Sequence, residues 1–72
     1  MRRLRQPTEL MWTLRKHHVT WSCELGSLGE WGFAVVIFRD GDPCLSHRFE
    51  RREDGDVWAA EYRLDLEQNS PN

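Results

Sequence analysis

Apolar and polar residues alternate along several stretches of this 72-residue chain, and the period of two is that of a β-strand with one buried face. The clearest stretch is 19–25, where Val19, Trp21, Cys23 and Leu25 alternate with polar neighbours. Two further stretches with this character are 11–16 and 44–49. Short polar loops separate the stretches, and strands joined by such loops pair antiparallel. We therefore predict an antiparallel meander.

The stretch 31–38 is apolar on both of its alternating faces, and it is rich in β-branched and aromatic residues. One face holds Trp31, Phe33, Val35 and Ile37, and the other holds Gly32, Ala34, Val36 and Phe38. A strand with two apolar faces belongs in the middle of a sheet, partly covered on both sides. This stretch is the third of four predicted strands.

The turn Asp40-Gly41 allows two registers between the third and fourth strands. A two-residue turn sets Val35 beside Ser46, whereas a three-residue loop over 39–41 brings large residues together on one face. We favour the longer loop because one face of the hairpin has to be buried. It pairs Val35 with Leu45, Phe33 with His47 and Trp31 with Phe49.

The segment 57–67 fits two structures. Its large residues alternate with polar ones, which favours a fifth strand, but most of its residues are helix formers. In a helix, one stripe would gather Gly55, Trp58, Ala59, Tyr62 and Leu66. The pattern alone leaves the choice open.

Five short motifs resemble a group of short uncharacterised bacterial proteins with no known activity. They are Trp12-Thr13-Leu14-Arg15-Lys16, Trp21-x-Cys23-Glu24-Leu25, Gly29-Glu30-Trp31-Gly32, Arg39-Asp40-Gly41 and Trp58-Ala59-Ala60-Glu61-Tyr62-Arg63. The resemblance implies a sheet followed by a C-terminal helix, and it begins near Met11. The chain departs from the group at 53–56, where better helix formers are usual, which puts the first helical turn in doubt.

With the helix adopted, the predicted fold is α+β, a four-stranded antiparallel meander with one C-terminal helix packed on one face. The expected organisation is a flexible basic arm over 1–10, a single small domain over 11–68 and a disordered tail over 69–72. Trp58, Tyr62 and Leu66 are the predicted anchors of the helix.

Charge and cysteine content narrow the function. The net charge is −2, and the chain contains two cysteines. We find neither an apolar stretch long enough to span a membrane nor a secretory signal after the basic N-terminus. We therefore expect a cytoplasmic protein that does not act at a membrane, with both cysteines as thiols.

Catalytic and metal-binding chemistry are not expected. Cys44 and His47 resemble two of the four ligands of a zinc site, with His17, His18 and Cys23 as further candidates. Positions three apart on a strand, however, point to opposite faces unless a bulge intervenes. Neither cysteine has a basic partner fixed beside it by the sequence. We predict no enzymatic activity, no cofactor and no metal.

Two binding functions remain. One helix covers one sheet face, so Ala34, Val36, Phe38 and Cys44 are predicted to lie on an uncovered face that self-association would bury. The favoured hypothesis is therefore a non-catalytic protein-interaction module, a homodimer or a binder of another protein. The alternative is a nucleic-acid-binding accessory protein, which the acidic segment 50–67 disfavours. Its predicted contacts are Arg2, Arg3, Arg5, Arg15, Lys16, Arg39 and Arg48.

Overall fold

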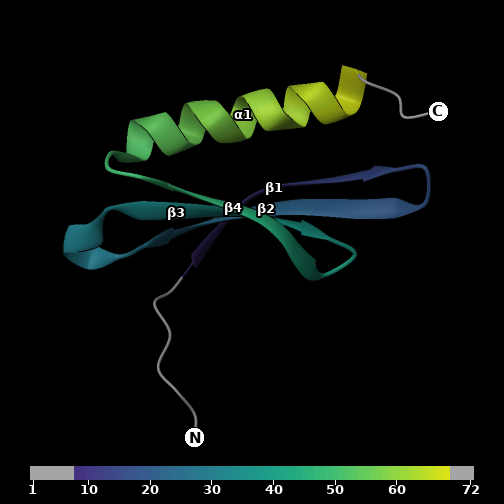
Figure 1. Cartoon of the computed structure of the whole chain (residues 1–72). Coiled ribbons are helices and arrows are strands. Elements are labelled where there is room, and N and C mark those ends of the chain that lie inside the picture. Colours follow the sequence, from purple (N-terminus) through teal and green to yellow (C-terminus); the bar gives the residue numbers. More distant parts are fainter. Residues whose placement is uncertain (1–7, 69–72) are drawn as a thin grey trace, which may run out of the picture.

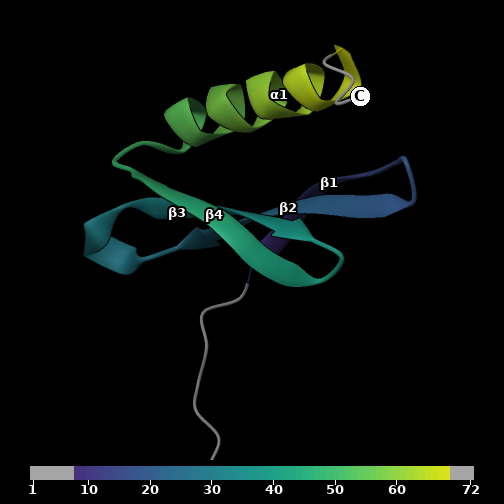
Figure 2. The ribbon, with the colours of Figure 1, turned by 45° about the vertical axis from the view of Figure 1, so that its right-hand side comes forward.

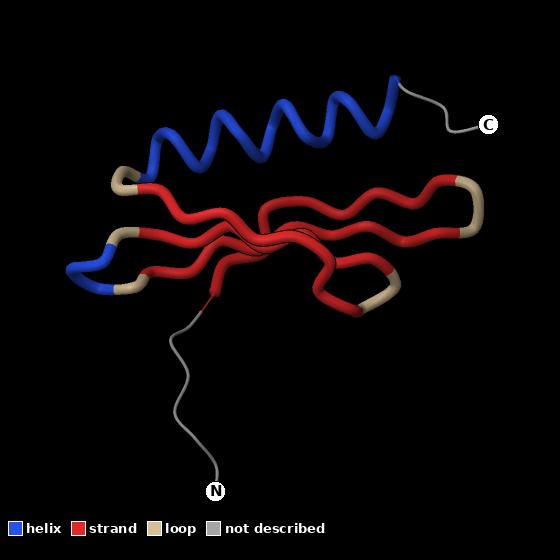
Figure 3. Tube along the Cα trace, viewed as in Figure 1, coloured by secondary structure: helices blue, strands red, loops and turns tan. Residues whose placement is uncertain are grey.

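A computed structural model describes residues 8–68 as a four-stranded sheet with one α-helix on one face (Figure 1). The elements in chain order are β1 (Thr8–Lys16), β2 (Val19–Ser27), the 3-10 turn η1 (Gly29–Trp31), β3 (Phe33–Arg39), β4 (Asp42–Phe49) and α1 (Arg52–Gln68). The strands are antiparallel and lie in the order β1-β2-β3-β4 (Figure 3). The predicted α+β meander is confirmed, and the fifth-strand alternative for 57–67 is wrong.

Two-residue turns join β1 to β2 and β3 to β4. His17 and His18 have φ values of 53° and 67°, and Asp40 and Gly41 have φ values of 52° and 87°. Positive φ at both central residues is typical of type I′ turns, whose twist matches that of the flanking strands. His and Asp tolerate this conformation better than most residues with a side chain do, so both hairpins close tightly.

The core lies between the sheet and α1. Its fully covered members are Cys23 and Leu25 of β2, Val35 and Ile37 of β3, and Ala59 of α1. Half-buried residues complete it around the edge, among them Met11, Trp12, Trp21, Phe33, Phe49, Trp58 and Tyr62. The predicted helix stripe is present, with its small residues buried and its large ones half-buried.

The doubtful first turn of the helix is helical, and Gly55 explains how it fits. A Cβ atom at Gly55 would lie 3.1 Å from Cγ2 of Val35 and 3.4 Å from side-chain carbons of Leu25 and Phe49. The absence of a side chain therefore lets α1 approach the middle of the sheet closely, at the cost of a poor helix former in the first turn.

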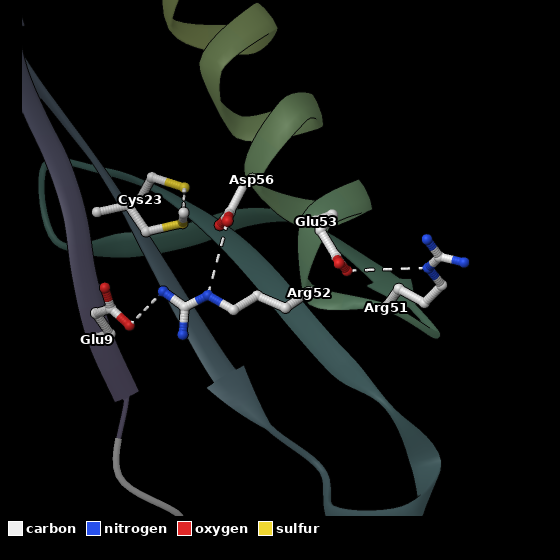
Figure 4. A network of polar contacts seen from close by, with 7 residues as sticks. Glu9, Cys23, Arg51, Arg52, Glu53 and Asp56 are labelled. Carbon is white, nitrogen blue, oxygen red and sulfur yellow. Dashed lines mark hydrogen bonds and ion pairs between the residues drawn. The ribbon is translucent and has the colours of Figure 1, made fainter.

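Three side chains join α1 to β1. Trp12 Nε1–H donates to the carbonyl oxygen of Ala59 at 3.2 Å, and Lys16 Nζ donates to two carbonyl oxygens of the last helical turn at 2.7 and 2.8 Å. At the other end of the helix, Arg52 Nη2 lies 2.7 Å from Glu9 Oε1, and Figure 4 shows its guanidinium between Glu9 and Asp56. The helix is thus held along its length against an edge strand.

The predicted register of the β3–β4 hairpin is wrong in both versions. The turn has two residues, and Arg39 pairs with Asp42, but the pairing then shifts by one residue at Cys44. Because of this β-bulge, Val35 lies opposite His47, and neither Ser46 nor Leu45 is its partner. The bulge restores Leu45, His47 and Phe49 to the face that carries Val35 and Ile37.

Trp31 is also placed differently from the prediction. It belongs to η1 and not to a strand, and its side chain is 71% exposed, so it does not lie under the helix. The strand begins one residue after Gly32, whose φ is 96°. A Cβ atom at Gly32 would lie 2.3 Å from the carbonyl oxygen of Phe49, so the backbones of the two segments touch there.

The first strand starts earlier than predicted. Thr8, Glu9 and Leu10 were assigned to the arm, but they pair with Gly26, Leu25 and Glu24 of β2. The remaining arm residues, including Arg2, Arg3 and Arg5, and the predicted tail over 69–72 lie outside the described residues.

Candidate interaction surface

The face of the sheet that points away from α1 is the candidate surface, and we call it the outer face. Ala34, Val36 and Phe38 alternate with the buried residues of β3, so their side chains lie on this face. In Figures 1 and 2, no described helix or strand covers this side of the sheet. The predicted placement of these three residues agrees with the strand geometry.

Each of these residues is flanked by polar or small neighbours. Val36 lies between Glu24 of β2 and Ser46 of β4. Phe38 lies between Ser22 and Pro43, and Ala34 lies between Gly26 and Arg48. The three residues are half-buried by such neighbours, although no helix or strand of residues 8–68 lies above them. The apolar part of the outer face is therefore a narrow band along β3.

Leu10 adds to this band, and the sequence prediction missed it. It pairs with Glu24, so it lies on the outer face in the same row as Val36, and it is 59% exposed. Alternation in the sequence would place Leu10 on the same face as Trp12 and Leu14, and only the bulge at Met11 moves it to the outer face. Residues 1–10 were also assigned to an arm, so nothing in the sequence indicated this placement.

Charges on the outer face are sparse and of both signs. Glu24 lies near the centre and accepts a hydrogen bond from Thr8 Oγ1 at 3.0 Å. Arg15 and Arg48 lie on the two edge strands, opposite Thr20 and Ala34 respectively. Two such surfaces attract each other when they are offset, because the negative centre of one then faces a positive edge of the other.

Cys44 does not belong with the other predicted interface residues. It is the extra residue at the β3–β4 bulge, so strand alternation does not assign it to the outer face. Its side chain is exposed. Burial, and to a lesser degree the charges of Cys44 and Asp65, raise the pKa of Tyr62 on α1 above the usual tyrosine value.

The bulge also removes the geometric objection to Cys44 and His47 sharing a face. His47 stacks on Phe49 with 4.4 Å between ring centroids and meets Trp58 edge-on at 5.4 Å. It is thus part of an aromatic cluster at the edge of the core. Over residues 8–68, no group of three or more His, Cys, Asp or Glu side chains is arranged to hold a metal ion.

Cys23 is a core residue. It is fully buried, and its Sγ lies 3.9 Å from Sδ of Met11. Burial, with a smaller contribution from Glu24, raises the pKa of its thiol to about 11. The thiolate is the nucleophilic form of cysteine, so Cys23 is held in its unreactive form at neutral pH.

The described cations predicted to contact nucleic acid do not share one surface. Arg15 and Arg48 lie on the outer face, at opposite edges of the sheet. Lys16 is occupied by the C-terminus of α1, and Arg39 lies on the helix side with its guanidinium 5.8 Å from the ring centroid of Trp21. The helix itself carries six carboxylates and two arginines.

Comparisons with known proteins give no family and no relative. No family model matches the chain, and neither a curated protein nor a solved structure matches it. Within residues 8–68, α1 is neither long nor apolar enough to cross a membrane, and no other helix there is.

Proposed function

We propose that this chain is a non-catalytic protein-interaction module that forms a homodimer through its outer face. The observation that carries the proposal is the one-sided architecture. Among residues 8–68, one α-helix covers one face of the sheet, and no described element covers the band formed by Leu10, Ala34, Val36 and Phe38 on the other. Covering such a band with a second copy is the simplest way to remove it from water.

The setting we propose is a reducing, cytoplasmic one, because Cys23 and Cys44 are both free thiols. An exposed thiol such as that of Cys44 would be open to oxidation and cross-linking elsewhere.

The test is the solution mass, measured by light scattering across a wide concentration series. We expect a dimer that Phe38→Glu converts to a monomer, because the substitution places a charge on the buried face. Phe38→Ser removes the apolar ring without adding charge, and it should weaken the dimer in the same direction. Circular dichroism of each variant establishes that it is folded.

Leu64→Glu is the matched control. Leu64 is 51% exposed on α1, on the other side of the molecule, and it receives the same kind of change. It should leave the dimer intact. A wild-type chain that stays monomeric at every concentration, or a dimer indifferent to both Phe38 variants, would refute the proposal.

Nucleic-acid binding remains the second proposal, and it has less support because the described cations lie on two faces of the sheet. The discriminating experiment is heparin retention at low salt, with and without residues 1–7. The deletion should stop before Thr8, since Thr8 already belongs to β1. Retention that falls with salt and disappears with the deletion would favour this second proposal.

A further inference from the structure

Trp31 is the most exposed large apolar side chain among residues 8–68, and it sits in a loop that is held in place by its own hydrogen bonds. Leu28 N–H donates to the carbonyl oxygen of Gly32 at 2.7 Å, and Trp31 N–H donates to that of Leu28 at 3.2 Å. Gly29 N–H donates to Ser27 Oγ at 3.2 Å. A side chain presented on such a loop loses little further conformational freedom on binding.

This loop borders the outer face. Arg48, which lies on the outer face beside Ala34, donates from Nη1 to the carbonyl oxygen of Trp31 at 2.6 Å. In Figures 1 and 2, the turn between β2 and β3 lies at one end of the sheet, the end at which the chain enters α1. Trp31 thus stands at the end of the outer face where β3 begins, and Phe38 lies near the end where β3 turns back.

The area of the outer face shows why Trp31 matters for a dimer. Four strands about 4.8 Å apart and about seven residues long give a face of roughly 19 by 23 Å, so two such faces bury about 900 Å². Specific interfaces need about 1,000 Å² or more. Trp31 is 71% exposed, which for a tryptophan side chain is about 180 Å². Burying this area in both copies raises the total buried area to about 1,250 Å².

We propose that Trp31 of each copy packs against Phe38 of the other copy, in a twofold dimer whose β3 strands run antiparallel across the two outer faces. The proposal rests on the self-association proposed above and specifies its geometry. With the twofold axis over Val35, the beginning of β3 in one copy lies over the end of β3 in the other. Phe38 then falls near the Trp31 loop of its partner.

The same axis matches large residues with small ones across the face. Val36 lies opposite Ala34 of the second copy. On β2, where Leu25 pairs with Val35, the axis sets Glu24 opposite Gly26. An axis centred on Val36 would instead set Glu24 against its own copy, where two like charges repel. The charge and size pattern of the outer face therefore selects the axis over Val35.

The test is a double-mutant cycle on the dimer dissociation constant, measured by sedimentation or light scattering for the wild type, Trp31→Ala, Phe38→Ala and the double variant. Loss of a tryptophan at the centre of a contact weakens binding by at least about 30-fold, and we expect this of Trp31→Ala. The double variant should bind little more weakly than the stronger single variant, because both changes remove one contact. Leu64→Ala, on α1, should change nothing.

The outcomes separate the two proposals. A monomeric wild type overturns the proposed function and this geometry with it. If Phe38→Ala weakens the dimer but Trp31→Ala changes the dissociation constant by no more than about twofold, the geometry alone is overturned, because loss of a hot spot would have a much larger effect. Losses that multiply in the double variant show that Trp31 does not contact Phe38, and they overturn the axis over Val35. Because Trp31 is 71% exposed, its variant should melt like the wild type in the monomeric state.

Discussion

Gly55 offers a sharp test of how closely α1 approaches the sheet, because two effects of Gly55→Ala act in opposite directions. Alanine is a better helix former than glycine, and at an unhindered position within a helix the exchange stabilises by about 1 kcal/mol. The new Cβ atom, however, would lie 3.1 Å from Cγ2 of Val35, where ordinary carbon contacts lie at about 3.5–4.0 Å. The sign of the result depends on whether Val35 can move.

The structure indicates that it cannot move cheaply. Val35 is fully buried, and as a β-branched residue it has restricted χ1 freedom. Leu25 and Phe49 stand 3.4 Å from the same Cβ position, so the helix has no free direction in which to shift. Overpacking of this kind costs about 1–3 kcal/mol, which exceeds the gain in helix propensity. We expect Gly55→Ala to lower the free energy of unfolding by about 1 kcal/mol, or roughly 4–8 °C in Tm for a domain this small.

The assay is urea unfolding followed by circular dichroism and by tryptophan fluorescence. Ala60→Gly calibrates it, since Ala60 is exposed on the same helix and the change should cost about 1 kcal/mol from propensity alone. If Gly55→Ala instead raised the free energy of unfolding by as much as Ala60→Gly lowers it, the close packing would not limit this position. The account of Gly55 would then be wrong.

Four further results are expected. Gly32→Ala should cost more than about 4 kcal/mol and leave the chain unfolded by circular dichroism, because its Cβ atom would collide with the carbonyl oxygen of Phe49 and its φ of 96° suits glycine alone. Lys16→Met should lower the free energy of unfolding by about 1–2 kcal/mol in urea, since two carbonyl oxygens at the end of α1 lose their donor, and a loss near zero would contradict that role. Trp58→Ala should cost about 3 kcal/mol, and a melt close to wild type would show that it does not anchor the helix. The pKa of the Cys23 thiol is about 11 in the folded state and near 9.0 in the unfolded chain. The stability that this difference provides is complete below pH 9, and about 2–3 kcal/mol of it is lost as the pH rises to 11. In urea titrations over that range, the free energy of unfolding of Cys23→Ala should therefore fall less steeply than that of the wild type.

Much of the fold follows from the period of the sequence. The alternation around Cys23 and Leu25 places β2 correctly, and Val35 and Ile37 lie on the face of β3 opposite to that of Ala34, Val36 and Phe38, as predicted. The stripe of α1 follows in the same way from its spacing. Helix and strand could not be separated there by pattern alone, since alternation and a helical stripe coexist in 57–67.

The details that prediction missed depend on contacts between distant segments. With the bulge at Cys44, the hairpin has a two-residue turn and still places the large residues of β3 and β4 on one buried face. The local sequence does not distinguish this arrangement from a longer loop without a bulge. Trp31 is a strand residue by propensity, but the Gly32 backbone contacts Phe49, and the strand begins only after Gly32. The candidate surface was predictable where it follows alternation, as at Val36 and Phe38, and was missed at Leu10, where β1 extends beyond the expected boundary.

The bonds between β1 and α1 join the first and last described elements, and this order has a consequence for synthesis on the ribosome. The four strands can pair with their neighbours as each emerges, but the side of the sheet that carries Cys23, Leu25, Val35 and Ile37 stays open until α1 follows. A transcript truncated before α1 would therefore yield a product prone to aggregation and dependent on chaperones.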